Sequence, residues 1–222
     1  MNLKQNLKHE DFPGELSPCV NLDLKLIYIH IPKCGGNSIK SSIGGFKGDS
    51  QFGAKYFNDL SIDLKDFKFA SFVRNPWDRA YSAYLYLSGG GINEYDEQSQ
   101  KKYISRFENF EDFVINGGLA SAAKHQLHFI PQYKFLNERV DFVGKLEHCQ
   151  CDFYYLCSLL KMNSAKLKHY NATKKRARDV IFTSKMIQQI YEVYRVDANL
   201  FGYAFKKNVF VHNRKYPNIK NY

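Results

Sequence analysis

The segment "IPKCGGNSI" holds a lysine, two glycines and two small polar residues in an order that suits an anion. Gly35 and Gly36 can take backbone angles that a Cβ forbids, so their amides can approach an anion closely. Asn37 and Ser38 would begin a helix, whose first N–H groups lack partners within the helix and favour negative charge. Together with the charge of Lys33, the segment predicts a turn that binds phosphate or sulfate, although a buried strand with an ordinary tight turn fits the same spacing.

The order of residues in this turn differs from that of the Walker A phosphate-binding loop. In a Walker A sequence the lysine follows the glycines, whereas Lys33 precedes them here. The turn is therefore not predicted to be a Walker A nucleoside triphosphate loop.

Such a turn needs a rigid strand before it and a helix after it. The residues from Leu26 to Ile31 are almost all apolar, which predicts a strand buried on both faces of a parallel sheet. Pro32 ends the strand because it has no N–H to donate. The helix that follows is expected to span two to three turns and to end at Gly44 and Gly45.

The segment "FKFASFVRNPWDRAYSAYLYL" repeats this organisation. An apolar strand is predicted at residues 69–73, a turn at Asn75 and Pro76, and a helix from about Trp77. Pro76 and Trp77 are interpreted as shaping the turn, and Arg79 is expected on the exposed face of the helix.

Further elements are predicted along the rest of the chain. Residues 89–102 are interpreted as a loop, either a lid over a site or a solvated connection. A strand is expected at 142–144. Helices are expected at 107–116, at 151–162, and from Thr183 to Leu200 with Thr183 or Ser184 as the N-cap. Alternating strands and helices predict an α/β fold of three layers, with helices on both sides of a central parallel sheet.

Length and composition place the chain among ordinary globular proteins. It has 222 residues, enough for one sizeable core, so we expect a loosely ordered lead-in at 1–23, one domain at 24–205 and a basic tail at 206–222. Its 32 Lys and Arg against 22 Asp and Glu leave a charge of +10, which favours anionic partners.

The cysteines and the apolar runs bear on location. An odd number of cysteines without paired spacing predicts neither a disulfide framework nor a zinc site; these are Cys19, Cys34, Cys149, Cys151 and Cys157. No run has the length of a signal peptide core or a membrane helix. We therefore expect a cytoplasmic protein without an integral membrane segment.

Six segments together resemble a known family. "IHIPKCGGNSI" followed by "FVRNPWDRAYSAY" resembles the paired nucleotide-binding motifs of the sulfotransferases that use 3′-phosphoadenosine 5′-phosphosulfate (PAPS). "HFIPQYKFL", "VDFVGKLEHCQCDF", "HYNATKKRAR" and "YEVYRVDANLFGY" resemble, in order, segments of its carbohydrate sulfotransferase branch, sulfotransferase family 2. The resemblance spans Lys25 to Tyr203 and implies a P-loop-like fold, PAPS as co-substrate and no metal.

The resemblance also implies residues that bind the nucleotide. The loop around the 5′-phosphosulfate matches Lys33, Cys34, Gly35, Gly36, Asn37 and Ser38. Asn37 stands where the family usually has threonine or serine. Arg74 and Ser82 match the pair that holds the 3′-phosphate, because a guanidinium binds phosphate bidentately and a hydroxyl can donate to the same group. The basic "HYNATKKRAR" segment is either a solvated charged loop or, as the resemblance implies, a flap in which Lys174, Lys175 or Arg176 approaches the cofactor or an acidic acceptor.

Transfer of a sulfuryl group to a hydroxyl needs a base, and histidine suits this role near neutral pH. The family's His-x-x-Pro-Gln pattern falls on His128, Pro131 and Gln132. His125, expected on the same helical face, is the alternative, and either histidine could instead belong to the core.

The resemblance thus implies a PAPS-dependent sulfotransferase that acts in line on a hydroxyl of a carbohydrate, with Lys33 and His128 as catalytic residues. One alternative is a P-loop-like kinase or nucleotide hydrolase, which lacks support because no acidic strand end for magnesium is evident. The other is a non-catalytic protein that binds polyanions, either nucleic acid or an acidic glycan, through its positive charge. For the sulfotransferase itself, nucleic acid is not expected as a partner.

Overall fold

The computed structural model describes residues 19–46, 54, 63–162, 166–168 and 180–205. These residues divide into two compact units. The first unit contains the described residues up to Val73 and from Phe135 to 168, and the second contains 74–134 and 180–205. The chain therefore leaves the first unit after Val73 and re-enters it at Phe135.

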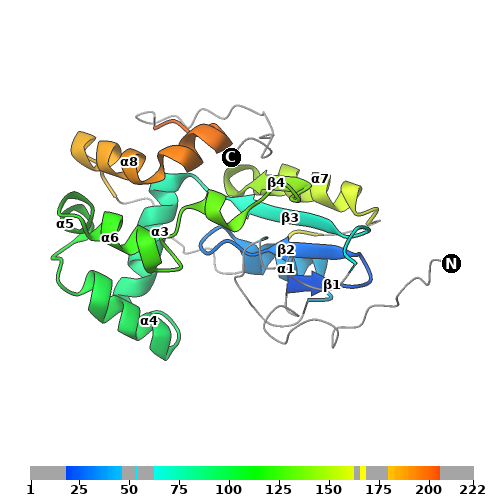
Figure 1. Ribbon diagram of the computed structural model, residues 1–222, viewed down its shortest axis with the longest axis horizontal. Coiled ribbons are helices and arrows are strands. Elements are labelled where there is room, and N and C mark those ends of the chain that lie inside the picture. The colour runs from blue at the N-terminus through cyan, green and yellow to red at the C-terminus, as the bar shows by residue number, and fades with distance from the viewer. Residues whose placement is uncertain (1–18, 47–53, 55–62, 163–165, 169–179, 206–222) are drawn as a thin grey trace. The chain divides into compact units, whose positions relative to one another are not determined.

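A four-stranded sheet forms the centre of the first unit (Figure 1). Its order is β1 (Val20–Asn21), β2 (Leu26–Ile29), β3 (Lys68–Val73) and β4 (Phe142–Lys145). The three strands β2, β3 and β4 are parallel, and β1 pairs antiparallel with β2 at the edge. This mixed α/β architecture confirms the predicted fold class. The edge strand β1 falls within the segment expected to be a loose lead-in.

The apolar side chains on both faces of the sheet are buried, as expected for parallel strands. Every residue of β2 is buried, and so is every residue of β3 except Lys68. The helices α1 (Gly36–Ile43) and α7 (Cys149–Leu159) supply residues to the core cluster that covers one face. This cluster contains Leu26, Tyr28, Ile39, Ala70, Phe72, Phe142, Phe153, Leu156, Cys157 and Leu167.

The predicted boundaries of these elements hold closely. The helix α1 begins at Gly36 and ends at Ile43, with Gly44 as its C-cap. A short 3-10 helix at Leu146–His148 joins β4 to α7. The strand predicted at 142–144 is one residue longer.

The second unit is helical. Its α-helices are α3 (Pro76–Ser88), α4 (Glu94–Ser99), α5 (Phe110–Ile115), α6 (Gly118–His125) and α8 (Ser184–Phe201). A π-helix at Gln100–Ile104 continues α4, and a 3-10 helix at Gln132–Phe135 ends this part of the chain. Thr183 caps α8 by accepting a hydrogen bond from the Met186 N–H, as predicted.

Trp77 joins α3 to α8 within the second unit. Its side chain is buried, and its Nε1–H donates to the Ile187 carbonyl at 3.0 Å. Asn75 caps α3 through its side chain, which accepts from the N–H groups of Trp77 and Asp78. The predicted turn at Asn75 and Pro76 is confirmed.

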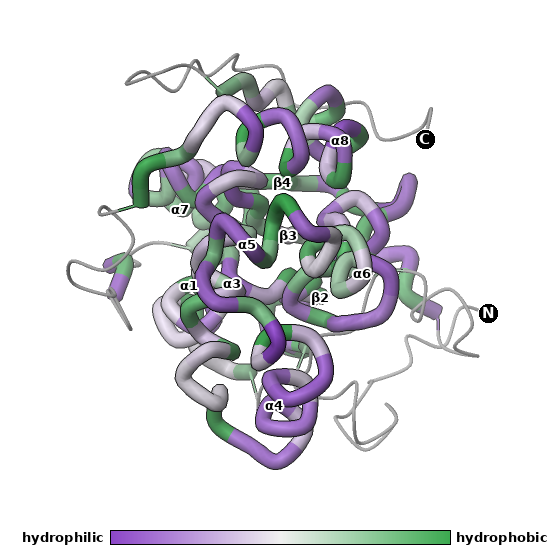
Figure 2. The backbone as a smooth tube through the Cα atoms, turned by 90° about the vertical axis from the view of Figure 1, so that its left-hand side faces the viewer, coloured by the Kyte–Doolittle hydropathy of each residue, from purple (hydrophilic) through white to green (hydrophobic). Residues whose placement is uncertain are grey.

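The prediction of a loop at 89–102 is wrong. After Gly91 the chain forms α4 and then the π-helix, and Asp96 and Ser99 are buried. The helix escapes detection by periodicity because α4 has only six residues and is mostly hydrophilic, as its purple tube in Figure 2 shows. Its start is nevertheless marked by Asn93, which accepts a hydrogen bond from the Asp96 N–H.

No helix among the described residues is both long and apolar enough to cross a lipid bilayer. The predicted basic flap with Lys174 and the basic tail at 206–222 lie outside the described residues.

Candidate functional site

The turn after β2 departs from ordinary backbone geometry. Lys33 has a φ of 67° and Gly35 a φ of 78°, so two residues of this turn are left-handed. This conformation is uncommon for a residue with a Cβ and is enriched at functional turns, although Lys25 and Lys161 also adopt it in this chain. The turn delivers the chain into α1, and Gly35 occupies the N-cap position.

Gly36 is required by a close approach to His30. A Cβ placed on Gly36 would lie 2.1 Å from His30 Cδ2 and 2.3 Å from His30 Nε2. The His30 ring is itself buried, just beyond the end of β2. The first residue of α1 must therefore lack a side chain, which leaves its backbone amide uncovered by a Cβ.

The start of α1 has the electrostatics of an anion site. Gly35 has no side chain with which to cap the helix, and the first turn contains no acidic residue. The side chain of Asn37 is exposed and that of Ser38 is partly exposed. Because the first N–H groups of a helix have no acceptor within it, this end favours a negative group, and Lys33 adds a full positive charge beside it in sequence.

Cys34 lies within the same turn but points inward. Its side chain is buried, and its Sγ donates to the Pro32 carbonyl at 3.6 Å. The thiol thus stabilises the turn, and any contact of this residue with an anion would come from its backbone.

The parallel pairing of β2 and β3 constrains where the two predicted motifs begin. Ile29 pairs with Ser71, and Ser71 Oγ donates to the Ile29 carbonyl at 2.7 Å. The carboxyl ends of the two strands therefore lie at one edge of the sheet, which is where ligands bind in open α/β folds. Arg74 follows β3 directly in the chain.

In the second unit, one amide side chain holds the backbone of Arg74. Gln132 Oε1 accepts from the Arg74 N–H at 2.8 Å, and Gln132 Nε2 donates to the Arg74 carbonyl at 2.8 Å. The two groups form a cyclic pair like that between neighbouring strands. Both hydrogen bonds use the backbone of Arg74, so its guanidinium takes no part in them. Gln132 belongs to the His-x-x-Pro-Gln pattern, and this contact gives its glutamine a structural role.

Asp197 of α8 fixes Gln132 in turn. Its carboxylate accepts from the N–H of Gln132 at 2.7 Å and from the N–H of Tyr133 at 2.9 Å. The side chain is fully buried. Burial raises the pKa of the Asp197 carboxyl, while the two backbone N–H groups and the charge of Arg79 act in the opposite direction.

The expectation that Arg79 lies on an exposed helix face is wrong. Arg79 is only 1% exposed, and its guanidinium donates to the Ile130 carbonyl at 3.0 Å. Tyr194 Oη donates to the neighbouring Phe129 carbonyl at 2.8 Å. Buried side chains of α3 and α8 thus hold successive peptide groups of the segment between His128 and Gln132.

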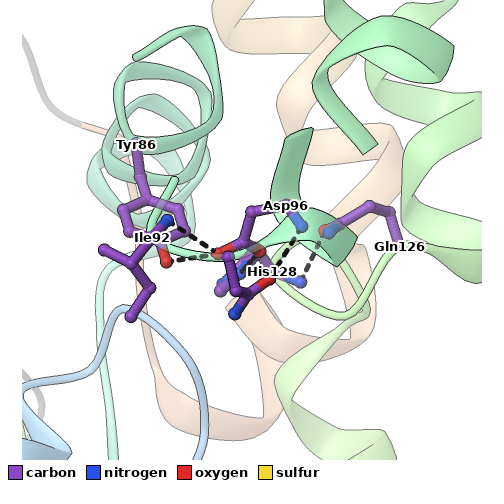
Figure 3. Close-up of polar contacts among 6 residues, drawn as sticks. Tyr86, Ile92, Asp96, Gln126 and His128 are labelled. Carbon is purple, nitrogen blue, oxygen red and sulfur yellow. Dashed lines mark hydrogen bonds and ion pairs between the residues drawn. The ribbon is translucent and has the colours of Figure 1, made fainter. Parts of the chain in front are cut away.

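His128 lies in a buried polar network of the second unit (Figure 3). It is 7% exposed, and its Nε2 lies 3.2 Å from Asp96 Oδ1. Tyr86 Oη donates to Asp96 Oδ2 at 2.5 Å, and the Tyr86 ring meets the His128 ring edge-on at 4.8 Å between centroids. The His128 N–H donates to Gln126 Oε1 at 2.7 Å. His128 is therefore held through both its imidazole ring and its backbone N–H.

His125 does not share a helical face with His128, contrary to expectation. The helix α6 ends at His125, which is exposed, and His128 lies in the turn that follows. The two histidines therefore have different surroundings, and in the part of the chain that the structure describes only His128 of the two lies beside a carboxylate.

Two predicted site residues remain, Ser82 and Lys174. Ser82 is partly exposed on α3, two helical turns beyond Arg74. Lys174 lies outside the described residues. Each unit thus carries its own part of the predicted set: the Lys33–Ser38 turn in the first, and Arg74, Ser82 and His128 in the second.

Reasoning from the sequence missed three residues that position this set, namely His30, Asp96 and Asp197. Asp197 lies in the "YRVDANLFGY" segment, whose acidic residue is surrounded by apolar helical positions, and this could have suggested a buried carboxylate. Asp96 stands three residues after Asn93, a spacing typical of a helix start. His30 carries no such signal, because its role depends on the fold of the following turn.

Comparison with known proteins gives one finding. A family model described as "Sulfotransferase family" matches residues 19–204, which is most of the chain. No curated protein and no solved structure matches the chain.

We expect Gly36→Ala to destabilise the protein by about 1–3 kcal/mol, because the new Cβ would overlap the His30 ring and force the turn to move. The free energy of unfolding measured in denaturant tests this. Gly89→Ala is the matched control, since a Cβ there meets nothing closer than 3.6 Å and should cost little. Adding His30→Ala to Gly36→Ala should restore part of the loss; no recovery would show that the collision is not the cause.

Proposed function

We propose that this chain, which belongs to the sulfotransferase family and is a PAPS-dependent enzyme, transfers a sulfuryl group to a hydroxyl of a carbohydrate. PAPS supplies the sulfuryl group when bound and leaves as adenosine 3′,5′-bisphosphate. The observation that carries the assignment of residues is the start of α1, where a left-handed Lys33 precedes a helix that begins at a glycine with no room for a side chain.

In this proposal the Lys33–Ser38 turn holds the 5′-phosphosulfate. The backbone amides of Gly35, Gly36, Asn37 and Ser38 donate to its oxygens, and the ammonium of Lys33 neutralises the charge left on the phosphate as its bond to sulfur breaks. The residues fit such a group, because the turn offers amides without side-chain cover and no carboxylate in the first turn of α1.

Arg74 and Ser82 hold the 3′-phosphate. The Gln132 amide fixes the backbone of Arg74 and does not use its guanidinium, so the side chain projects from a rigid point. A guanidinium can bind two phosphate oxygens at once, and the partly exposed Ser82 hydroxyl can donate to the same group. Lys174, in the basic segment, adds a further positive charge toward the nucleotide or an acidic acceptor.

His128 acts as the base. As the oxygen of the acceptor hydroxyl bonds to sulfur and the bond from sulfur to the phosphate oxygen breaks, the imidazole takes the hydroxyl proton. The carboxylate of Asp96 beside the ring supports this role, because it stabilises the imidazolium that forms.

A carbohydrate is proposed as the acceptor because the segments after residue 128 resemble those of carbohydrate sulfotransferases. The test is incubation of the protein with PAPS and a panel of glycans, lipids and small alcohols, with sulfated products identified by mass. Sulfation of glycans alone supports the proposal. Sulfation of lipids or small alcohols but not of glycans contradicts the acceptor class, and a requirement for magnesium would contradict direct transfer by side chains and amides.

Arg74→Ala should weaken binding of adenosine 3′,5′-bisphosphate by about 10- to 100-fold, the value of a charged hydrogen-bonding group. Binding of adenosine 5′-monophosphate, which has no 3′-phosphate, should not change. Calorimetric titration of both nucleotides tests this.

Arg106→Ala provides the control for a general loss of charge. Arg106 is an exposed arginine of the same unit whose guanidinium lies 4.8 Å from the centre of the Phe107 ring. It should leave both affinities unchanged. Equal weakening of both nucleotides by Arg74→Ala would contradict a specific 3′-phosphate contact.

His128→Ala should lower kcat by about 10²- to 10⁴-fold while the affinity for adenosine 3′,5′-bisphosphate stays the same, because the base acts only on the acceptor proton. His125→Ala, at an exposed position, should keep the normal kcat. Steady-state kinetics with a sulfated glycan as product measure both. The reverse result would make His125 the base, and normal rates in both variants would remove histidine from the mechanism.

A further inference from the structure

His128 is closed to an acceptor in this structure. It is 7% exposed, its Nδ1 is buried, and its Nε2 lies 3.2 Å from Asp96 Oδ1. A base must come within hydrogen-bond distance of the proton that it takes. The role of base proposed for His128 therefore requires that part of its cover moves before the acceptor reaches the imidazole.

The helix α4, which covers Nε2 of His128 with Asp96, is held mainly by polar contacts. Its buried residues are Asp96 and Ser99, both polar. Its Tyr95 is 53% exposed, and Ile92 just before it is 84% exposed. The helix α5, which also has six residues, buries three apolar side chains, those of Phe110, Phe113 and Val114. Because segments with little buried apolar surface open most easily, α4 should open at a lower cost than α5.

The backbone on both sides of α4 suits a hinge. Gly90 and Gly91 precede it with φ of 84° and 66°. A Cβ at Gly90 would meet no described atom within 4 Å, so the backbone conformation, and not packing, calls for a glycine there. The helix continues into the π-helix Gln100–Ile104, a rare geometry that often occurs at functional sites and whose last two residues are buried here. Residues 92–99 thus lie between two glycines and an anchored end.

Asp96 connects this segment to its surroundings (Figure 3). Its Oδ2 accepts from Tyr86 Oη at 2.5 Å, and its Oδ1 faces His128 Nε2. Burial raises the pKa of Asp96, but the hydrogen bonds from Tyr86, Ile92 and His128 together lower it by more, so the carboxyl is ionised and accepts all three. One carboxylate thus closes Nε2 of His128 and also holds α4 against α3.

We propose that residues 92–99 form a lid over His128, that Asp96 is its latch, and that the lid opens to admit the acceptor hydroxyl to Nε2. This inference rests on the proposed role of His128 as the base. Opening breaks the contacts of Asp96 with Tyr86 and His128 and transfers the carboxylate to water, while the cap at Asn93 moves with the lid. The open state is a minor population of the free protein, and the acceptor increases it by binding that state.

Hydrogen exchange in the full chain tests the lid without catalysis. The amides of Asp96 and Asp112 are a matched pair, because each donates at 2.9 Å to the asparagine that caps its six-residue helix. After correction for intrinsic rates, we expect the Asp96 amide to exchange about 10-fold faster or more. Burial alone predicts the opposite order, since Asp96 is the more buried of the two. Equal protection, or slower exchange at Asp96, would overturn the lid.

Tyr86→Phe loosens the latch and keeps the ring that packs against His128. Because it removes a hydrogen bond to a charged group, the open population should rise by about 10- to 100-fold. Exchange of the His128 Cε1 hydrogen with deuterium, which reports access of water to the ring, should accelerate. Tyr84→Phe, on the same helix but packed against Phe110, is the matched control and should not change this rate. An unchanged rate in Tyr86→Phe would overturn the latch, and the amide comparison decides if this variant does not fold.

Kinetics connect the lid to the reaction and separate it from the proposed function. For the glycan that the acceptor panel identifies, Tyr86→Phe should lower KM by up to about the same factor, because more of the protein is open to it. The affinity for adenosine 3′,5′-bisphosphate should not change. An unchanged or higher KM would overturn admission of the acceptor by the lid. Normal kcat in His128→Ala would overturn the proposed base, whereas low kcat in His128→Ala with equal amide protection would overturn the lid alone.

Discussion

The structure of the second unit depends on one cyclic pair of hydrogen bonds, in which the Gln132 amide binds both backbone groups of Arg74. A side-chain amide has the same donor and acceptor spacing as a peptide, so Gln132 acts as one extra residue of strand beside the chain that leaves β3. Asp197 in turn fixes the backbone of Gln132. The guanidinium proposed to hold the 3′-phosphate therefore extends from a backbone that the buried side chains of Gln132 and Asp197 already immobilise. Less conformational entropy is then lost when the phosphate binds.

The two units prepare for negative charge by different physical means. In the first, the start of α1 lacks groups that would hinder an anion sterically or repel it: Gly36 has no Cβ, and the first helical turn contains no acidic side chain. In the second, buried charged side chains bind the backbone of the segment they support: Arg79 donates to the Ile130 carbonyl, and Asp197 accepts from two N–H groups. Removing one partner of such a network is expensive because the other charge stays buried. The first arrangement suits a group that arrives and departs, and the second suits a rigid support.

Local sequence patterns predicted the strands and most helices well. Burial and side-chain partners that depend on contacts between distant residues were not predicted. Apolar runs located β2, β3 and β4, and glycine at 44 located the end of α1, because both signals act over a few residues. Arg79 looked exposed because the carbonyl that buries it is 51 residues away. The segment at 89–102 looked like a loop because its helix is short and polar. The partner of His128 was missed for the same reason, since Asp96 lies on that helix.

The position of Asp197 has a consequence for how the protein is made. Asp197 follows Gln132 by 65 residues and lies on α8, the last described helix. During synthesis the Arg74 and Gln132 segments leave the ribosome long before this carboxylate exists, and domains form as their chain emerges. The support of the phosphate-binding arginine is thus completed by a residue that appears 65 positions after Gln132. A nascent chain stopped before α8 would carry every proposed catalytic residue and still lack the carboxylate that fixes Gln132 and, through it, the backbone of Arg74, so tight binding of the 3′-phosphate should arise only after α8 has packed.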